Sequence, residues 1–567
     1  MTGVSLNDFR PLFPAEEALL QSLNSGIFDR TGDGLCPESG VQENEVKERT
    51  IRAGLLRYLL LDGRGDIRPH EKGLWITGAL ITGILDLEGC RIPRVIALRN
   101  CRFMAAPVLR AAIIDSLELD GSSLPGLNAE GLEVRGGISL IGATVSGAIF
   151  MPGCRLGGSL RCDRATLSSA KKTALDADAL IARSVLMRKA KVEGGISLFG
   201  ARLGMDLNAT DCQISHQEGI AINADGIEAR GNILLRACRI KGEVRMIGAY
   251  IAGDMDFSGA ALTNPGNDAL QLNRAVIKGG FFLREQASIQ GTLDMTGATM
   301  GTLHDDLACW PDKGDLLLNR CLYNAFIDGP VDARSRLEWL DRQSPERWGQ
   351  DFWPQPYEQL ATVFQSMGHD DDARSVLIAK ERLQRRARRD RAKNPIWRAT
   401  LAAKDAILAV TVLYGRQPLI AFVWLLLFWL LGIGIFGYAE SQGAFKPASA
   451  VVLRSPEWTF CAIDNSKERV LPGNQQSTAG RALPGQNQLS CFQDQWEAAS
   501  YPRFNASMYS LDTLFPVLEI DQKSFWRPDQ SKPWGTMAIW YFYIQSVLGW
   551  ALSLLAVAGF SGLVKSR

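Results

Sequence analysis

A short repeat fills residues 76–323 and limits the folds that this chain can adopt. The repeat follows the pattern h-x-h-x-x-[A/C]-x-h, where h is apolar, as at Ile138, Leu140, Ala143 and Val145. After Ala143 the Ala/Cys position recurs every 10 or 11 residues, and a longer step of 15 residues returns at a fixed phase. Four units therefore form a super-repeat of 47 or 48 residues.

Units this short are too small for helix–helix or strand–helix repeats, and their alternating apolar residues indicate short strands. Two units, about 21 residues, predict one coil of a parallel β-helix whose inward side chains form ladders. The long steps hold polar inserts at residues 168–172, 215–219 and 263–267, which predict loops at one edge of the stack. The end coils need caps, and helices expected near residues 15–23 and 43–61 suit the first coil.

Most cysteines are explained by this repeat. Those at the Ala/Cys position are Cys90, Cys101, Cys154, Cys212, Cys238 and Cys321, and Cys162 occupies another inward position. A free cysteine there acts as a small buried apolar residue. The four histidines are scattered without ligand spacing, so no metal site is predicted.

Helical segments with a basic run are expected to follow the β-helix. Residues 332–341 predict a helix, and residues 354–382 predict a helical hairpin with a turn near Gly368. The arginines proposed to contact lipid headgroups are Arg385, Arg386, Arg388, Arg389 and Arg391. Because this run precedes a hydrophobic span, anionic lipid and the positive-inside rule explain it better than nucleic acid does. The net charge of +1 gives no general attraction to nucleic acid.

Two uncharged apolar stretches, residues 418–439 and 537–564, are long enough to span a membrane. The basic run places the side before the first span in the cytoplasm, so both termini are expected there. The loop 440–536 would then be extracytoplasmic, where Cys461 and Cys491 are the candidates for a disulfide. The string Gly432-x-Gly434-x-x-Gly437 lies inside a span, without the strand that a dinucleotide site needs, so no cofactor is predicted.

The segment before the second span resembles the two-helix pore module of potassium-type channels, with a short Tyr-Ser-Leu-Asp-Thr-Leu stretch that starts at Tyr509. The resemblance stops at the filter, because no Gly-Tyr-Gly follows, and potassium selectivity is not implied. The candidate pore-loop residues are Asp512, Thr513, Pro516, Glu519 and Asp521. Gln545, Gly549 and Ser553 share one face of the second span, suited to helix contact or to a wet lumen.

The whole chain resembles a bacterial family of pentapeptide-repeat-like β-helix membrane proteins, often labelled membrane-associated oxidoreductases. The resemblance rests on the Arg-Ala-Gly-Leu-Leu-Arg-Tyr entry at Arg52, the strands from Ile76, the Pro-Gln-Pro-Tyr-Glu-Gln-Leu-Ala helix and the segment at Tyr509. It implies the architecture and an inner-membrane location. It also implies a redox activity for which we find no cofactor-binding residues.

The sequence thus predicts a mainly β chain: a helical cap (1–75), a parallel β-helix (76–329), a helical hairpin and basic neck (330–416) and a membrane domain (417–567). Its expected function is a membrane-tethered cytoplasmic scaffold that binds an unidentified protein. The alternatives are an oligomeric, channel-like effector gated by the solenoid and a membrane oxidoreductase. No catalytic, metal or cofactor residues are predicted, and enzymatic activity and homo-oligomerisation are left open.

Overall fold

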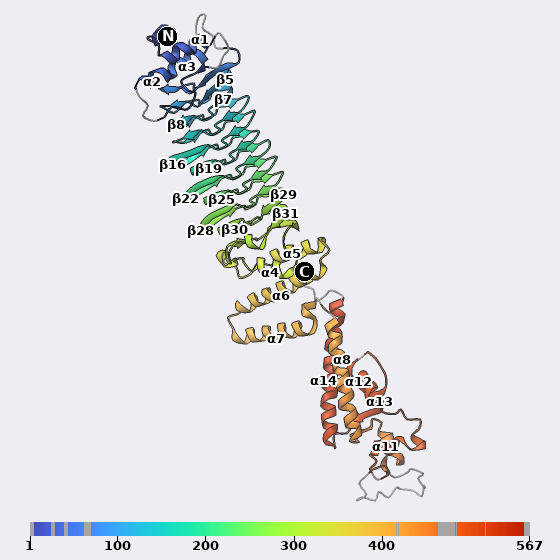
Figure 1. The fold of residues 1–567 in the computed structure, drawn as a ribbon. Helices are drawn as coiled ribbons and strands as arrows, with labels where there is room; N and C mark the ends of the chain where they lie inside the picture. Colours follow the sequence, from blue (N-terminus) through green and yellow to red (C-terminus); the bar gives the residue numbers. More distant parts are fainter. Residues whose placement is uncertain are drawn as a thin grey trace, which may run out of the picture. The chain divides into compact units, whose positions relative to one another are not determined.

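The computed structural model describes residues 5–23, 29–38, 43–61, 70–415, 417, 419–462, 482–483, 485–515 and 517–560. The chain forms two compact units, Met1–Lys380 and Glu381–Arg567. The first is a parallel β-solenoid of about 11 turns with helices at both ends, as Figure 1 shows. The second is mainly helical.

A coil of the solenoid contains up to four short strand segments, and in several coils neighbouring segments merge into one longer strand. In one coil the four segments are β10 (Glu133–Val134), β11 (Ile138–Ser139), β12 (Thr144–Val145) and β13 (Ile149–Phe150). The next coil begins at β14 (Arg155–Leu156), where Glu133 pairs with Arg155, 22 residues further on. The predicted coil of two sequence units is therefore confirmed.

Two sheets run along the solenoid. Besides β10, β11 and β14, the first sheet contains β1 (Asp29–Arg30), β3 (Gly73–Thr77), β5 (Arg91–Arg99), β7 (Ile113–Glu118), β15 (Leu160–Arg161), β17 (Ile181–Ala182), β18 (Val185–Leu186), β20 (Arg202–Leu203), β21 (Leu207–Asn208), β23 (Glu228–Ala229), β24 (Ile233–Leu234), β26 (Tyr250–Ile251), β27 (Met255–Asp256), β29 (Val276–Leu283), β31 (Thr299–Asp305) and β33 (Leu322–Ile327). Besides β12 and β13, the second contains β2 (Thr50–Arg52), β4 (Leu80–Thr82), β6 (Arg102–Phe103), β8 (Ser123–Leu124), β9 (Leu127–Asn128), β16 (Thr166–Asp176), β19 (Lys191–Ser197), β22 (Gln213–Asn223), β25 (Arg239–Arg245), β28 (Ala261–Gln271), β30 (Ser288–Asp294) and β32 (Leu316–Leu317).

The Ala/Cys position lies inside the solenoid, next to a turn. Cys154, Cys212 and Cys238 are fully buried there, and the Sγ of Cys238 donates to the carbonyl of Ala209 at 2.8 Å. Burial raises the pKa of the Cys154 thiol to about 12, so this sulfur stays protonated at neutral pH. These cysteines are packing residues, as the sequence predicted, although Cys90 is half-buried.

The polar inserts are accommodated inside long strands rather than as separate loops. In β16, β22 and β28 the pairing shifts register at the insert, as between Ser215 and Ile220 of β22. A glycine with positive φ lies beneath the insert in the following coil. A Cβ on Gly242 (φ 116°) would stand 2.4 Å from the carbonyl oxygen of His216, so only glycine fits.

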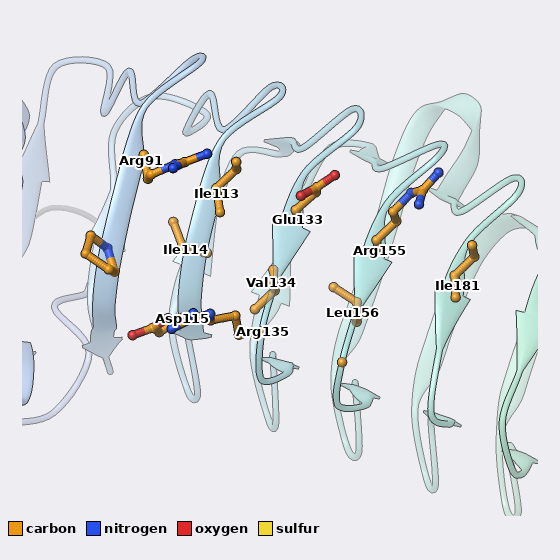
Figure 2. A pocket seen from close by; sticks show the side chains of 12 residues that line it. Arg91, Ile113, Ile114, Asp115, Glu133, Val134, Arg135, Arg155, Leu156 and Ile181 are labelled. Carbon is orange, nitrogen blue, oxygen red and sulfur yellow. Dashed lines mark hydrogen bonds and ion pairs between the residues drawn. The ribbon is translucent and has the colours of Figure 1, made fainter.

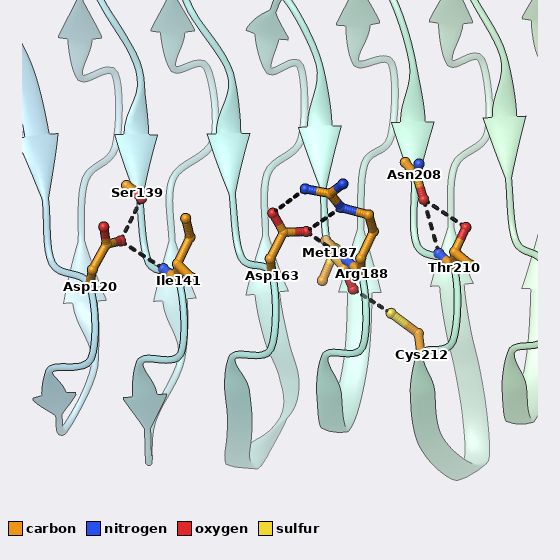
Figure 3. A network of polar contacts seen from close by, with 9 residues as sticks. All are labelled: Asp120, Ser139, Ile141, Asp163, Met187, Arg188, Asn208, Thr210 and Cys212. Atoms are coloured by element: carbon orange, nitrogen blue, oxygen red, sulfur yellow. Dashed lines mark hydrogen bonds and ion pairs between the residues drawn. The ribbon is translucent and has the colours of Figure 1, made fainter.

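Side-chain carboxylates and amides tie neighbouring coils together at the corners. Asp120 accepts hydrogen bonds from the Ser139 hydroxyl and the Ile141 amide of the next coil (Figure 3). Asp163 binds Arg188 through Nε at 2.9 Å and Nη2 at 2.8 Å. Burial alone would raise the pKa of Asp163, but the hydrogen bonds from Arg188 outweigh it and lower that pKa.

Helices cap the first coils, with one correction to the prediction. The helix η1 (Leu6–Phe9) and the helices α1 (Pro14–Ser22), α2 (Glu43–Arg49) and α3 (Ala53–Leu60) lie there. The single helix expected over residues 43–61 is interrupted by β2, which pairs in parallel with β4. The buried carboxylate of Glu16 binds Arg52, the last residue of β2, and so joins α1 to the sheet.

A second cap closes the last coil. It consists of η2 (Leu307–Cys309), α4 (Ala333–Leu340), η3 (Pro345–Trp348) and α5 (Gln355–Ser366), and α6 (Asp370–Asp390) follows as the second arm of the predicted hairpin. The side chain of Arg336 on α4 is fully buried and binds both oxygens of Asp305 on β31, at 2.6 and 2.7 Å. This ion pair fixes the cap to the solenoid.

The second unit contains two helices that are long and apolar enough to cross a membrane, α8 (Leu419–Ser441) and α14 (Pro533–Phe560). Before them lie α7 (Pro395–Val412), which the sequence analysis did not predict, and η4 (Leu413–Gly415). Between them lie β34 (Phe445–Pro447), α9 (Ala450–Leu453), α10 (Pro456–Thr459), α11 (Gln488–Gln493), η5 (Trp496–Ala498), α12 (Ala506–Leu514), α13 (Gln522–Phe525) and β35 (Trp526–Pro528). The antiparallel pair β34 and β35 and a buried aromatic cluster around Trp526 organise this connection.

Candidate binding surface

One flank of the solenoid carries two rows of outward side chains, which we call the flank strip. The first row is in register across the coils: Arg91, Ile113, Glu133, Arg155, Ile181, Arg202, Glu228, Tyr250, Val276, Thr299 and Leu322. The second row follows two residues after the nine positions from Ile113 to Thr299: Asp115, Arg135, Gly157, Arg183, Gly204, Arg230, Ala252, Lys278 and Gly301. The residue between the two rows is buried in every one of these coils, as Val134 is between Glu133 and Arg135, so both rows point away from the core.

The charge of the flank strip differs from that of the chain as a whole. The strip contains seven basic and three acidic side chains. Its net charge is therefore +4, whereas that of the whole chain is +1. In the second row the basic residues Arg135, Arg183, Arg230 and Lys278 are spaced by 48, 47 and 48 residues, which is every second coil. Since neighbouring strands lie ~4.8 Å apart, these cations recur about every 10 Å along the flank.

Small residues lie between these cations. Gly157, Gly204 and Ala252 occupy the intervening coils and Gly301 the coil after Lys278, so the second row alternates long basic side chains with small residues. The first row adds exposed apolar groups, with Ile181 39% and Tyr250 44% exposed. A surface with regularly spaced basic side chains and some exposed apolar ones suits a partner whose surface carries both carboxylate and apolar side chains.

At the N-terminal end of the strip the surface is hollowed into an open groove of about 710 Å³. Figure 2 shows Arg91, Glu133 and Arg155 projecting along one row of this groove, while Arg135 reaches toward Asp115 on the neighbouring coil. That pair is 3.4 Å apart and its arginine is 80% exposed, so it contributes little to stability.

The structure also brings together a hydroxyl, an imidazole and a carboxylate that sequence reasoning could not connect. The Nε2 of His304 lies 3.0 Å from the Thr302 hydroxyl, and its Nδ1 lies 3.3 Å from Asp328 of the next coil. Phe282 stacks on the imidazole with ring centres 4.0 Å apart, and His304 is only 8% exposed. Because one face of the ring is covered and Asp328 also binds Arg284 at 2.9 Å, this cluster acts as a packed polar ladder.

Among the described residues, no cluster of histidine, cysteine and carboxylate side chains with metal-binding geometry is present. Cys162 and Cys321 are buried, and burial raises the pKa of each thiol to about 12. Such thiols carry no nucleophilic thiolate at neutral pH.

The candidate pore-loop residues lie on α12 and in the turn after it. The carboxylate of Asp512 is fully buried, accepts the amide of Lys523 at 2.9 Å and lies 3.3 Å from the Nζ of Lys523. Thr513 donates to the Tyr509 carbonyl within α12, and Asp521, at the N-cap position before α13, has positive φ. Glu519 is exposed, and Pro516 lies outside the described residues. Asp512 thus closes the turn after α12, which the sequence alone did not indicate.

The face of α14 that was predicted for helix contact or a lumen does contact neighbouring helices. The amide nitrogen of Gln545 donates to the Ser510 hydroxyl of α12 at 2.8 Å and to the Phe428 carbonyl of α8 at 3.2 Å. The carbonyl of Leu514 would stand 1.9 Å from a Cβ on Gly549. Ser553 is half-buried on the same helix, and its hydroxyl oxygen is shielded from solvent.

We expect Gly549→Ala to displace α12 from α14, because the added methyl group would overlap the backbone of Leu514. Overpacking of this kind destabilises by about 1–3 kcal/mol. In full-length protein in detergent, amide exchange in α12 should accelerate by roughly one to two powers of ten. Gly434→Ala is the matched control, because open space surrounds that glycine on α8. Equal amide exchange of α12 in the two variants would show that α12 is not packed against Gly549.

The proposed disulfide is present, since Cys461 and Cys491 are joined with their Cα atoms 5.7 Å apart.

The proposed headgroup arginines divide into two groups. Arg385 and Arg389 bind the carboxylate of Asp405 on α7 at 3.0 and 2.8 Å. The other three, Arg386, Arg388 and Arg391, are exposed.

These features define a β-solenoid protein with a basic, partly apolar flank and two helices that could cross a membrane. No family model, curated protein or solved structure matches the chain.

Proposed function

We propose that this protein is a membrane-tethered scaffold whose solenoid binds an acidic protein partner along the flank strip. The observation that carries the proposal is the row of four basic side chains at every second coil, separated by small residues. In-register stacking turns a sequence repeat into a linear array of charges, and such arrays bind extended surfaces through many weak contacts.

The tether in this proposal is the pair α8 and α14, which have the length and composition of membrane spans. Two crossings leave both termini on one side, and the positive-inside rule with the basic end of α6 makes that side the cytoplasm. An inner-membrane location in a bacterium rests on the family resemblance at Arg52, Ile76 and Tyr509. A reporter fused after residue 567 should be active in the cytoplasm under this topology.

Charge reversal on the strip tests the binding proposal. We expect Arg135→Glu, Arg183→Glu and Arg230→Glu together to weaken binding of a fluorescent polyglutamate peptide about tenfold or more, because exposed pairs contribute up to ~1 kcal/mol each. Fluorescence anisotropy with full-length protein in detergent measures the affinity, and binding to the unaltered strip should weaken as salt is added.

The control carries the same change of net charge elsewhere on the solenoid. Arg164→Glu, Lys189→Glu and Arg239→Glu alter three exposed residues away from the strip, two of them in turns before strands of the second sheet and the third on β25 of that sheet. If both triple variants lose affinity equally, attraction is general and the strip is not the binding site. If neither loses affinity, the proposal is wrong.

A further inference from the structure

The helix α7 has an apolar face that no other element covers among the described residues. Opposite Asp405 on the helical wheel lie Ile396, Ala399, Ala403, Ile407 and Val410, spaced by three or four residues, and we call this the α7 stripe. All five are exposed, including Ile396 at 74%, Ile407 at 59% and Val410 at 55%. For a helix of 18 residues this is a large unburied apolar surface.

The opposite face of α7 is fixed by polar contacts. Asp405 is nearly buried and receives Arg385 and Arg389 from the C-terminal half of α6, so α6 packs on the side away from the stripe. The guanidinium of Arg385 also lies 4.9 Å from the ring of Tyr414. These contacts fix the rotation of α7, so the stripe faces outward as a consequence of packing.

The C-terminal end of α7 is joined to both candidate spans. Leu408 packs against Ala421 of α8 and Ala556 of α14, and the indole nitrogen of Trp424 donates to the Val410 carbonyl at 3.1 Å. Figure 1 shows α7 running crosswise to α8 and α14, and it shows α6 alongside α7. Since α8 begins at Leu419, only six residues separate the two helices.

We infer that α7 is an interfacial helix whose stripe enters the headgroup region of the bilayer that α8 and α14 cross. The inference rests on the proposed membrane insertion of these two helices. Helices that lie in an interface bury an apolar face about 5–10 Å deep and keep basic and aromatic groups at the rim. Trp397 and Lys404, both exposed on α7 and flanking the stripe on the helical wheel, have the chemistry of such a rim.

The lipid surface that fits is anionic. Arg386, Arg388 and Arg391 are exposed on and just after α6, whose axis is expected ~10 Å from that of α7 because the two helices pack together. Exposed basic side chains next to a membrane-surface helix attract anionic headgroups, and this attraction falls off within a Debye length of ~8 Å at physiological ionic strength. The neutralisation of Asp405 by Arg385 and Arg389 removes the one acidic group of α7 from this surface.

Spin labels placed on full-length protein in phosphatidylcholine–phosphatidylglycerol vesicles test the inference. The variants are Ile407→Cys and Val410→Cys on the stripe, Lys404→Cys at the rim and Leu426→Cys on α8, which is 52% exposed. The half-buried Cys36 and Cys90 are replaced by serine in every variant to limit background labelling. Relaxation by oxygen, which concentrates in lipid, is compared with relaxation by a water-soluble nickel chelate.

We expect the ratio of oxygen to nickel accessibility to be severalfold higher at Ile407 and Val410 than at Lys404, and highest at Leu426. Labels on the stripe that are as open to nickel as Lys404, while Leu426 lies in lipid, would overturn the inference and leave the proposed spans intact. Stripe labels shielded from both reagents would overturn it in favour of a protein contact. A Leu426 label open to nickel would refute the membrane insertion on which the inference rests.

Discussion

Replacing Asp305 with alanine is expected to loosen the C-terminal cap from the solenoid by about 3–5 kcal/mol, the penalty for leaving a buried charge without its partner. The side chain of Arg336 is fully buried, and Asp305 is its anionic partner. The same carboxylate accepts the indole nitrogen of Trp310 at 2.7 Å, so the substitution also removes that hydrogen bond. The guanidinium, which lies 3.7 Å from the centre of the Phe326 ring, would keep only aromatic and carbonyl contacts.

Hydrogen exchange measures this effect where it arises. A loss of 3–5 kcal/mol corresponds to roughly two to four powers of ten in the opening equilibrium of β31 and β33. Because each coil of a solenoid contacts only its neighbours, exchange in early coils such as the one containing β10 should change little. Thermal loss of the β-sheet circular dichroism signal should begin at a lower temperature in the variant.

Two further variants separate the ion pair from general sensitivity of the cap. Arg334→Ala alters the same helix at a side chain that is 91% exposed, and we expect an effect within ~0.5 kcal/mol. Asp305→Leu combined with Arg336→Met removes both charges, and it should recover much of the stability lost in Asp305→Ala. If the double variant is as unstable as the single one, packing around the pair and not its charge holds the cap.

Loss of the disulfide between Cys461 and Cys491 is expected to destabilise the connection between α8 and α14 by about 3–4 kcal/mol. The two cysteines are 30 residues apart, and restricting a chain loop of that length in the unfolded state gives a stabilisation of this size. Both sulfurs are buried in the cluster that contains Trp458, Phe492 and Trp526, so opening the bond exposes an aromatic core. Cys461→Ser with Cys491→Ser should lower the melting temperature of the full-length protein in detergent.

The same bond reports on topology, because disulfides persist in oxidising compartments. In freshly isolated membranes, a maleimide reagent applied under denaturing conditions should modify two more thiols after reduction than before. Cys90, a half-buried thiol of the solenoid, should react without reduction and provides the internal control. Full modification before reduction would place residues 440–536 in a reducing compartment and refute the proposed topology.

The sequence predicted the solenoid because the repeat itself encodes it. Each inward position, such as Ala143 or Cys154, must fit the same turn in every coil, and this requirement is visible as a period. The two apolar helices could also be predicted, because a membrane span requires about 20 consecutive uncharged, apolar residues, and these are visible in the local composition. The pairing of Cys461 with Cys491 followed from their place in one loop between these helices.

Pairing between residues far apart in the sequence decided the features that the sequence analysis predicted wrongly or missed. The helix expected over residues 43–61 is broken because residues 50–52 find an unpaired edge at β4, which outweighs their local helical context. The predicted loops became bulges because the coils on either side hold their strands in register. The partnership of Asp512 with Lys523 depends on a turn whose path the sequence does not specify.

The sequence by itself determined the period, the inward ladders and the lengths of the two apolar helices, because these depend on residues close together in the chain. The tertiary structure alone decided that Arg135, Arg183 and Arg230 form one basic row and that the α7 stripe faces away from α6. Both depend on register and rotation, and these are fixed only when distant strands pair and when Asp405 meets its two arginines.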